Sequence, residues 1–440
     1  MSVMRKHLSL GIALALSASL LVAPANPLST VAPATAAPAP APTIGCNTAA
    51  LQQHLNSILN QGGLSSFGGI VTNSLGKTYW DKSADRLLAP ASVTKLLTAY
   101  SALHVLDRNA RQKTTVSLAI DGSLVLHGTG DVTISRRKNG RTFYRNAPRL
   151  NDLANQVKRK LDRVPPALRP KRLIIDNSFY SGPTMAPGWY REDIGGGSIT
   201  PMVPAMLDGG RVYDTGWYNS RTPNPSLQLG ATLLQYLGLK DVKIEVGTPR
   251  LAPFTLGSIQ SATLEDRVAD MLLYSDNVLA ESIGREVAAA KGQPASFRGA
   301  ANAVLEEVRA HGISTKGAKL YDTSGLSNLN RLSARTVTET LRPRSAVEKR
   351  TVTDIIYRYL PIAGQTGTLR YRFGGPAAAG RGHVRAKTGS LTGVSTLAGV
   401  VYTRRSGTPL YFSFLANNSY GWGPNSTIDQ LSTAVYLHGC

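Results

Sequence analysis

Three short motifs of chemically active side chains occur in a fixed order along the chain: Ser92-Val-Thr-Lys95, Ser275-Asp-Asn277 and Lys387-Thr388-Gly389. A serine hydroxyl is a poor nucleophile until a neighbouring base removes its proton. A lysine can be that base near neutral pH only if its pKa falls by roughly 3 units from its ordinary value of about 10.4. Burial and a second cation both lower a lysine pKa. The motifs therefore predict a nucleophilic serine with a lysine base.

The Ser-x-x-Lys pattern is weak by itself, because it also occurs at residues 74–77 and 135–138. After Pro90, apolar residues recur at helical spacing as far as Leu106, so Ser92 is predicted to begin a buried helix. Side chains three residues apart share one face of a helix, which places the lysine amine beside the hydroxyl. Ser74 lies in a turn-like sequence and Ser135 in a basic run, so we predict that both are exposed to solvent.

The other two motifs can complete such a site. Ser275 and Asn277 stand between two predicted helices and offer a proton relay and an amide that orients the substrate and the lysine. Lys387 stands on a predicted strand, where it can supply the second cation and, with Thr388, bind a substrate carboxylate. Gly389 allows a close approach of backbone.

The elements that must position these motifs are mixed helices and strands in a chain of 440 residues, which is long enough for two or three domains. Helices are predicted over residues 263–274, 278–290 and 428–437, and strands over 383–388, 395–402 and 410–416. Short β-type runs with Gly, Pro and basic stretches fill residues 114–249. This change of texture predicts an inserted region.

The first 45 residues predict export. A basic start, an apolar run over residues 8–22 and the sequence Ala34-Thr-Ala36 are typical of a signal peptide over residues 1–36. The alternative, a membrane anchor, is disfavoured because the run is shorter than the roughly 20 residues of a spanning helix. An Ala/Pro-rich tether over 37–45 follows. In an oxidising compartment we expect Cys46 and Cys440 to form a disulfide, and a lipidated Cys46 is disfavoured by the Pro-rich tract before it.

The chain is strongly basic: 49 Lys and Arg against 27 Asp and Glu give a formal net charge of +22. That charge alone fits nucleic acid, an anionic membrane or an acidic cell-wall polymer. Export and the lack of aromatic residues within the basic runs disfavour nucleic acid. The seven histidines lack the spacing of metal ligands, so no metal and no cofactor is expected.

The three motifs together resemble those of the serine penicillin-recognising enzymes. The separation of Ser92 and Ser275, 275 − 92 = 183 residues, and the composition of the region between them resemble those of one family. This is the D-alanyl-D-alanine carboxypeptidase/endopeptidase family, the class C low-molecular-mass penicillin-binding proteins. Further stretches share this resemblance, among them Asp208-Gly-Gly-Arg-Val212, Asp322-Thr-Ser-Gly-Leu-Ser327 and Val384-Arg-Ala-Lys-Thr-Gly-Ser-Leu391. The resemblance implies a mixed α/β fold: a serine β-lactamase-like penicillin-binding domain with an antiparallel sheet and a helical part, split by a large β-rich insert. We expect that domain over residues 46–106 and 258–440 and the insert over 107–257.

The resemblance also implies a role for each motif residue. Ser92 would be the acylated nucleophile, Lys95 its base and Ser275 a proton shuttle. Substrate would be held by Asn277, Lys387, Thr388, Gly389 and Ser390, and the backbone amides of Ser92 and Ser390 would form the oxyanion hole.

The activity implied is that of a secreted serine D-Ala-D-Ala carboxypeptidase acting on peptidoglycan stem peptides and acylated by β-lactams, with DD-endopeptidase action on cross-links left open. Anionic cell-wall polymers are further candidate partners. One alternative is a β-lactamase-like hydrolase, disfavoured because no Glu stands in a recognisable loop motif as a deacylation base. A second is a non-catalytic wall- or penicillin-binding module, which would not need Lys95.

Overall fold

The computed structural model describes residues 48–165, 169–213, 215–216, 219–247, 251–344, 352–421 and 423–439. These residues all belong to the unit that spans Cys46–Cys440. The predicted signal peptide, the tether, Cys46 and Cys440 lie outside the described residues.

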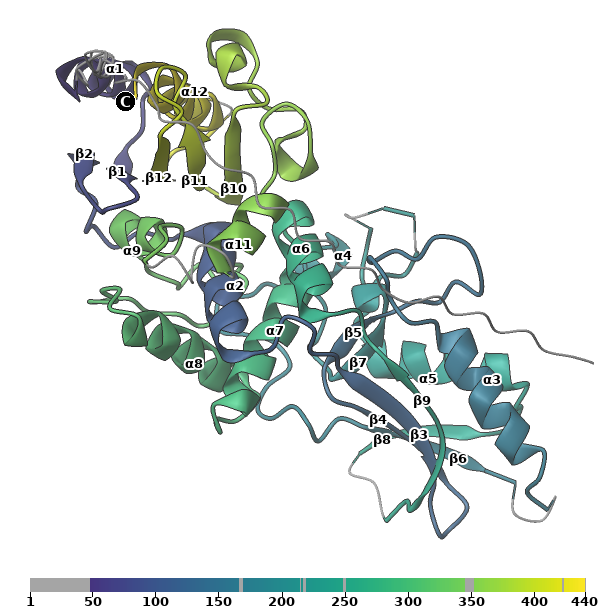
Figure 1. Ribbon diagram of the computed structural model, residues 1–440. Helices are drawn as coiled ribbons and strands as arrows, with labels where there is room; N and C mark the ends of the chain where they lie inside the picture. The colour runs from purple at the N-terminus through teal and green to yellow at the C-terminus, as the bar shows by residue number, and fades with distance from the viewer. Residues whose placement is uncertain are drawn as a thin grey trace, which may run out of the picture. The chain divides into compact units, whose positions relative to one another are not determined.

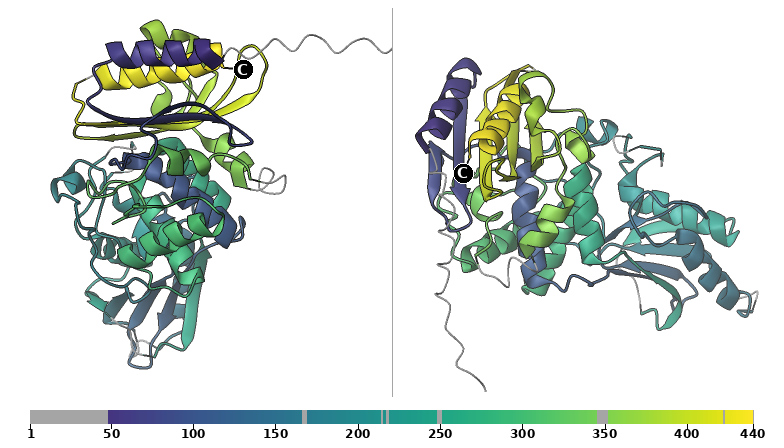
Figure 2. Two further views of the ribbon diagram at one scale, coloured as in Figure 1. Left: turned by 90° about the vertical axis from the view of Figure 1, so that its left-hand side faces the viewer. Right: turned by 45° about the horizontal axis from the view of Figure 1, so that its top comes forward.

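The first layer is a five-stranded antiparallel sheet in the order β10-β11-β12-β1-β2. Its three C-terminal strands confirm the predicted strands, although each is longer than expected. Helices α1 and α12 cover one face, and a core that includes Leu51, Phe412 and Leu431 lies between helices and sheet (Figure 2). The bounds are α1 (Thr48–Gln61), β1 (Ser66–Asn73), β2 (Thr78–Lys82), β10 (Val384–Leu391), β11 (Val394–Tyr402), β12 (Pro409–Asn417) and α12 (Gly423–His438).

A group of helices packs against the other face of the sheet (Figure 1). Helix α2 is buried from Thr94 to Ala102. Its apolar residues therefore lie on all sides of the helix and not on one face only. The predicted helices over 263–274 and 278–290 are confirmed as α6 and α7, and the Thr263 side chain caps α6 by accepting from Asp266 N–H. The bounds are η1 (Ala91–Val93), α2 (Thr94–Val105), α6 (Leu264–Tyr274), α7 (Asn277–Ala290), α8 (Phe297–Ala310), α9 (Ala334–Glu339), α11 (Asp354–Tyr359), η5 (Gly367–Leu369) and η6 (Gly375–Gly380). None of the helices in the described part of the chain combines the length and apolar character needed to cross a membrane.

The region between α2 and α6 contains its own mixed sheet, in the order β8-β6-β4-β3-β9, with parallel pairing of β4, β6 and β8. Two helices that the sequence analysis did not identify, α3 and α5, pack on this sheet around Leu153, Ile175 and Leu233. Strand β9 runs across the division expected between residues 257 and 258. The bounds are β3 (Lys113–Leu118), β4 (Leu124–Gly128), β5 (Asp131–Ile134), α3 (Leu150–Leu161), β6 (Arg172–Asp176), α4 (Glu192–Gly195), β7 (Ala205–Leu207), η3 (Asp208–Gly210), α5 (Pro225–Leu237), β8 (Lys243–Gly247) and β9 (Phe254–Gln260).

One prediction about the insert was wrong. Ser135, expected at the solvent-exposed surface, is fully buried, and its hydroxyl accepts a hydrogen bond from Arg137 N–H. That expectation rested on the basic run after Ser135, but the serine directly follows β5 and pairs with Arg149 through a β-bridge.

Candidate active site

Ser92 lies in η1, the single turn that leads into α2. The preceding residue, Ala91, is buried and has a φ of 50°, in the left-handed region that costs a non-glycine residue about 1–3 kcal/mol. The loop beside it approaches so closely that a Cβ at Gly325 would stand 1.9 Å from the Ala91 carbonyl oxygen. A tightly packed, strained turn therefore fixes the position of Ser92.

Lys95 follows one helical turn later and is completely buried. Its Nζ donates hydrogen bonds to Ser92 Oγ at 2.9 Å, Asn277 Oδ1 at 2.6 Å and the Ser324 carbonyl oxygen at 2.7 Å. The structure thus brings the predicted nucleophile and the predicted base into direct contact.

Burial lowers the pKa of Lys95 to about 8, because the charged amine has lost its water. The carboxylates of Asp322, Asp276 and Glu281 act in the opposite direction and keep the pKa from falling further. At that pKa, about a tenth of the lysine is neutral at pH 7.

Ser275 and Asn277 lie at the junction of α6 and α7, as predicted. Ser275 ends α6 with a φ of 61°, and this left-handed turn separates the two helices. The Asn277 side chain links two parts of the site, because its oxygen accepts from Lys95 and its Nδ2 donates to the Ser198 carbonyl oxygen at 3.0 Å. Ser198 comes from the insert, which the sequence analysis had not connected with the site.

Lys387 lies on β10 and is completely buried. Its Nζ donates to Ser275 Oγ and to the Thr388 carbonyl oxygen, both at 2.8 Å. Burial, reinforced by the positive charge of Lys95, holds the pKa of Lys387 well below its usual range. The amine thus lies behind Ser275 and Thr388, rather than at the pocket surface.

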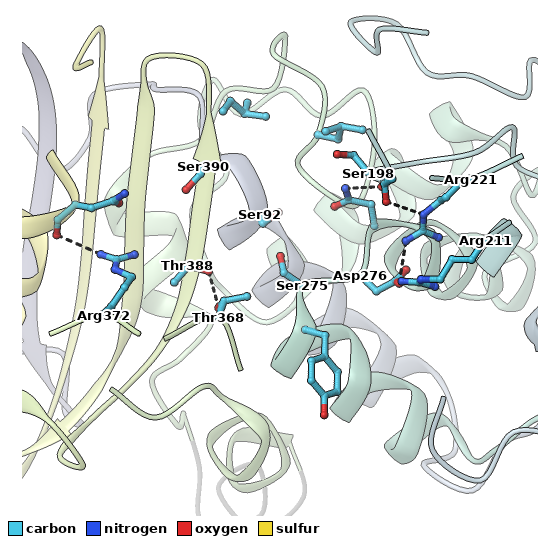
Figure 3. Close-up of a pocket in the computed structure, with 16 residues that line it drawn as sticks. Ser92, Ser198, Arg211, Arg221, Ser275, Asp276, Thr368, Arg372, Thr388 and Ser390 are labelled. Carbon is cyan, nitrogen blue, oxygen red and sulfur yellow. Dashed lines mark hydrogen bonds and ion pairs between the residues drawn. The ribbon is translucent and has the colours of Figure 1, made fainter. Parts of the chain in front are cut away.

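Strand β10 approaches the nucleophile at Gly389. A Cβ there would stand 2.2 Å from Thr396 Oγ1 and 2.9 Å from both the Pro90 carbonyl oxygen and Ser92 N. Only a glycine permits this contact, as the sequence analysis expected. Ser390, the next residue, lies on the strand beside Ser92 in Figure 3.

These elements surround a cavity of about 320 Å³. Thr388 and Ser390 form one wall, Ser92 and Ser275 lie at its centre, and Asp276 with two arginines forms the opposite wall (Figure 3). The Thr388 hydroxyl donates to Thr368 Oγ1 at 2.7 Å. The other lining residues are Gly197, Ser198, Tyr274, Asn277, Leu326, Arg372, Leu391 and Asn425.

Two arginines of the insert hold Asp276, and the sequence analysis missed both. Arg211 Nη2 and Arg221 Nη2 donate to Asp276 Oδ2 at 2.8 and 3.1 Å, and all three side chains are at most 2% exposed. Asp276 Oδ1 accepts from Leu279 N–H and thereby caps α7. Arg211 stands within one of the family-like stretches, which was the only signal in the sequence.

A second group of buried residues that the sequence analysis missed holds the loop that contacts Lys95. Glu281 accepts from the backbone N–H groups of Thr323 and Ser324 at 2.9 and 2.8 Å. Burial, followed by the nearby charge of Asp322, raises the pKa of Glu281 to about 7. Since the Ser324 carbonyl accepts from Lys95, Glu281 positions the lysine through this loop.

Comparison with known proteins agrees with this geometry. A family model described as D-Ala-D-Ala carboxypeptidase 3 (S13) matches residues 51–223 and 219–435. Carboxypeptidase DacB of Mycolicibacterium smegmatis is 43% identical over 381 residues, which cover 85% of this chain and 80% of that protein. A carboxypeptidase of Mycobacterium tuberculosis is 40% identical over 390 residues, covering 86% and 81%.

Among solved structures, penicillin-binding protein 4 from Haemophilus influenzae superimposes with a TM-score of 0.70 at 20% sequence identity, covering 89% of this chain and 98% of that one. The same protein solved with a bound β-lactam gives a TM-score of 0.67. This likeness confirms the predicted fold class. The family model matches most of the chain, and two relatives are more than 30% identical to it. The chain therefore belongs to the D-Ala-D-Ala carboxypeptidase 3 (S13) family.

Proposed function

We propose that the protein is a serine-type D-Ala-D-Ala carboxypeptidase that cleaves the terminal peptide bond of peptidoglycan stem peptides through an acyl-enzyme on Ser92. One observation carries the proposal: the buried Lys95 Nζ lies 2.9 Å from Ser92 Oγ and has a lowered pKa. Membership of the family supplies the substrate class.

Acylation begins when Lys95, in its neutral form, accepts the proton of the Ser92 hydroxyl. The freed Oγ attacks the carbonyl carbon of the penultimate D-Ala. Negative charge develops on the carbonyl oxygen, and the backbone N–H groups of Ser92 and Ser390 stabilise it. The close approach of Gly389 to Ser92 N brings β10, which also carries Ser390, beside the nucleophile.

The leaving D-Ala amine needs a proton, and Ser275 is placed to deliver it. The Ser275 hydroxyl lines the cavity and is held in place by the hydrogen bond that it accepts from Lys387. Ser275 gives its own proton to the amine and takes up the proton that Lys95 removed from Ser92, so that Lys95 is neutral again. Water then hydrolyses the acyl-enzyme, with Lys95 again acting as base. Asn277 holds Lys95 in position during both steps.

The terminal carboxylate of the substrate binds against Thr388 and Ser390, which line the cavity. Lys387 lies buried directly behind this wall, where its amine donates to the Thr388 carbonyl oxygen. A β-lactam presents a comparable carboxylate beside a reactive carbonyl, so we expect it to acylate the same serine.

Export and a disulfide belong to this proposal as well. The basic and apolar features of residues 1–36 support a signal peptide, and a peptidoglycan substrate lies outside the cytoplasm. The ring of His54, in the middle of α1, stacks on that of His438, at the end of α12, with centroids 3.8 Å apart, so the two helices nearest to the cysteines in sequence pack side by side. That proximity supports a disulfide between Cys46 and Cys440. Anionic cell-wall polymers would be further partners, held by the positive charge of the chain.

The test is release of D-Ala from an acylated tripeptide ending in D-Ala-D-Ala. We expect stoichiometric D-Ala from the wild type, none from Ser92→Ala and a loss of about 100- to 10,000-fold in Lys95→Ala. Ser74→Ala is the matched control, because it alters a Ser-x-x-Lys sequence outside the cavity and should keep full activity. Equal activity in Ser92→Ala and the wild type would refute the proposal.

A further inference from the structure

One end of the insert combines exposed apolar side chains with basic ones. Three segments meet there around a hollow of about 640 Å³: the β3–β4 turn over residues 118–123, residues 169–172 and Phe254 at the start of β9. We call this end the insert tip. In Figure 1 the β3–β4 turn lies at the bottom of the view, and the five-stranded antiparallel sheet beside the catalytic cavity lies at the top.

Two large apolar side chains of the insert tip face solvent. Ile120 is 74% exposed and Phe254 is 59% exposed. Ile120 is a central residue of the turn that is closed by a hydrogen bond from Gly122 N–H to the Ala119 carbonyl oxygen, and glycine or polar residues usually occupy such positions. Phe254 pairs with Leu118 on the neighbouring strand, which places it beside this turn. Neither the turn nor the core of the insert therefore accounts for these two side chains.

Basic side chains surround the apolar pair. Arg169 and Lys171 are exposed, and neither forms an ion pair with any residue that the structure describes. Asp121, the only carboxylate among the residues that define the tip, is already paired with Arg172 at 2.7 Å. Lys160, at the end of α3, donates to a backbone carbonyl oxygen at the start of β9, 2.8 Å away, and adds a further positive charge. The tip thus has an excess of positive charge around an apolar centre.

An anionic lipid bilayer is the partner that engages both kinds of side chain. Its headgroups attract lysine and arginine, and the acyl chains beneath them take up exposed apolar side chains. An anionic polymer in water offers charge alone, so its binding would leave Ile120 and Phe254 in contact with water. The apolar pair therefore favours a membrane over a polymer at this surface.

We propose that the insert tip docks the protein on the surface of an anionic phospholipid bilayer. Ile120 and Phe254 enter the bilayer at the level of the headgroups, and Arg169 and Lys171 contact the lipid phosphates. Because the tip and the antiparallel sheet lie at opposite ends of the unit in both views of Figure 2, docking leaves the catalytic cavity open to substrate. The inference goes beyond the proposed function and rests on it only for export.

The test is sedimentation of the mature protein, which lacks the apolar run of the signal peptide, with lipid vesicles. We expect it to bind vesicles of phosphatidylcholine and phosphatidylglycerol in equal parts about tenfold or more tightly than vesicles of phosphatidylcholine alone, and less tightly as salt is raised. Ile120→Ser/Phe254→Ser should weaken binding to the mixed vesicles about tenfold or more. Leu75→Ser/Tyr402→Ser, which changes one exposed aliphatic and one exposed aromatic residue outside the insert, should bind as the wild type does.

A second pair of variants tests the charge of the tip. Arg169→Gln/Lys171→Gln should lose the preference for phosphatidylglycerol, whereas Arg404→Gln/Arg405→Gln, with two exposed arginines of the β11–β12 turn changed, should keep it. Circular dichroism checks the folding of each variant. Ile120→Ser alone, in an exposed turn, replaces the double serine variant if that variant does not fold.

Several results would overturn the inference. The wild type could bind no vesicles or bind both lipid compositions equally, or the serine variant of the tip could bind the mixed vesicles as the wild type does. Binding to purified anionic cell-wall polymer without binding to vesicles would instead assign the tip to polymer attachment. Failure of the proposed function looks different, because then the wild type binds vesicles but penicillin does not acylate it.

Discussion

Arg211 reaches from the insert to Asp276 in the Ser-Asp-Asn motif and donates to it across 2.8 Å, with both side chains out of contact with water. The insert is therefore a structural part of the catalytic wall. Arg221 makes a second contact with the same carboxylate, so that two buried cations hold one buried anion. Together they hold the carboxyl group of Asp276 ionised, with its pKa far below the usual range despite burial.

Asp276→Ala should strongly destabilise the protein, because it leaves two buried guanidinium groups without their carboxylate. Removing one side of a buried ion pair costs about 3–5 kcal/mol. The measurement is urea unfolding followed by circular dichroism. Asp85→Ala is the control, since Asp85 is 75% exposed beside Arg335, and such a pair contributes about 1 kcal/mol or less. Similar losses in the two variants would contradict the account of the buried network.

Acylation should depend on pH through Lys95. Only the neutral amine can accept the Ser92 proton, and the pKa of Lys95 is about 8. The acylation rate should therefore rise about tenfold per pH unit below this value and level off above it. Stopped-flow kinetics with a chromogenic β-lactam between pH 5.5 and 9.5 would measure the profile. A rate that is constant over this range would exclude Lys95 as the base.

Glu281→Gln should move that profile to lower pH. The Glu281 carboxylate favours the charged form of Lys95, so removing its charge lowers the pKa of the lysine. Glutamine retains an oxygen that can accept from Thr323 and Ser324 N–H. Glu306→Gln, on the exposed surface of α8, should leave the midpoint unchanged. A midpoint that moves upward or stays in place in Glu281→Gln would be inconsistent with the electrostatic coupling.

Gly389→Ala should reduce acylation by about 100-fold or more, since the added methyl group forces β10 away from Ser92, and a displacement near 1 Å can cost that much. Gly195→Ala, where the added Cβ meets no atom within 4 Å, should behave as the wild type. Thermal melting of both variants separates local displacement from unfolding. Normal acylation in a folded Gly389→Ala protein would show that the close approach is not required.

The contact between Ser92 and Lys95 could be predicted from the sequence because it depends on local geometry. Ser92 and Lys95 stand three residues apart at the start of a helix, and Lys387, Thr388 and Gly389 are consecutive on one strand. The burial of Lys387 behind Ser275 depends on how two distant segments meet, which no local pattern contains. The contacts of Arg211 and Arg221 with Asp276 also join segments far apart in the sequence, so no local pattern predicts them.

Helix α3 is a different case, because its signal was present. Leu150, Leu153 and Val157 recur at helical spacing and are all buried. Because short β-type runs lie on either side of it, the sequence analysis interpreted the whole region as strands. The prediction for Ser135 was wrong for a similar reason: the basic residues after it reach solvent, while its own side chain is buried directly after β5.

The most direct test of the account is intact-mass analysis of the mature protein after incubation with benzylpenicillin. We predict one covalent adduct per chain, carrying the full mass of the drug, in the wild type and in Ser74→Ala, and no adduct in Ser92→Ala. Peptide mapping should place the adduct on Ser92. A folded wild-type protein that forms no adduct, or an adduct that persists in Ser92→Ala, would contradict the assignment of Ser92 as the nucleophile.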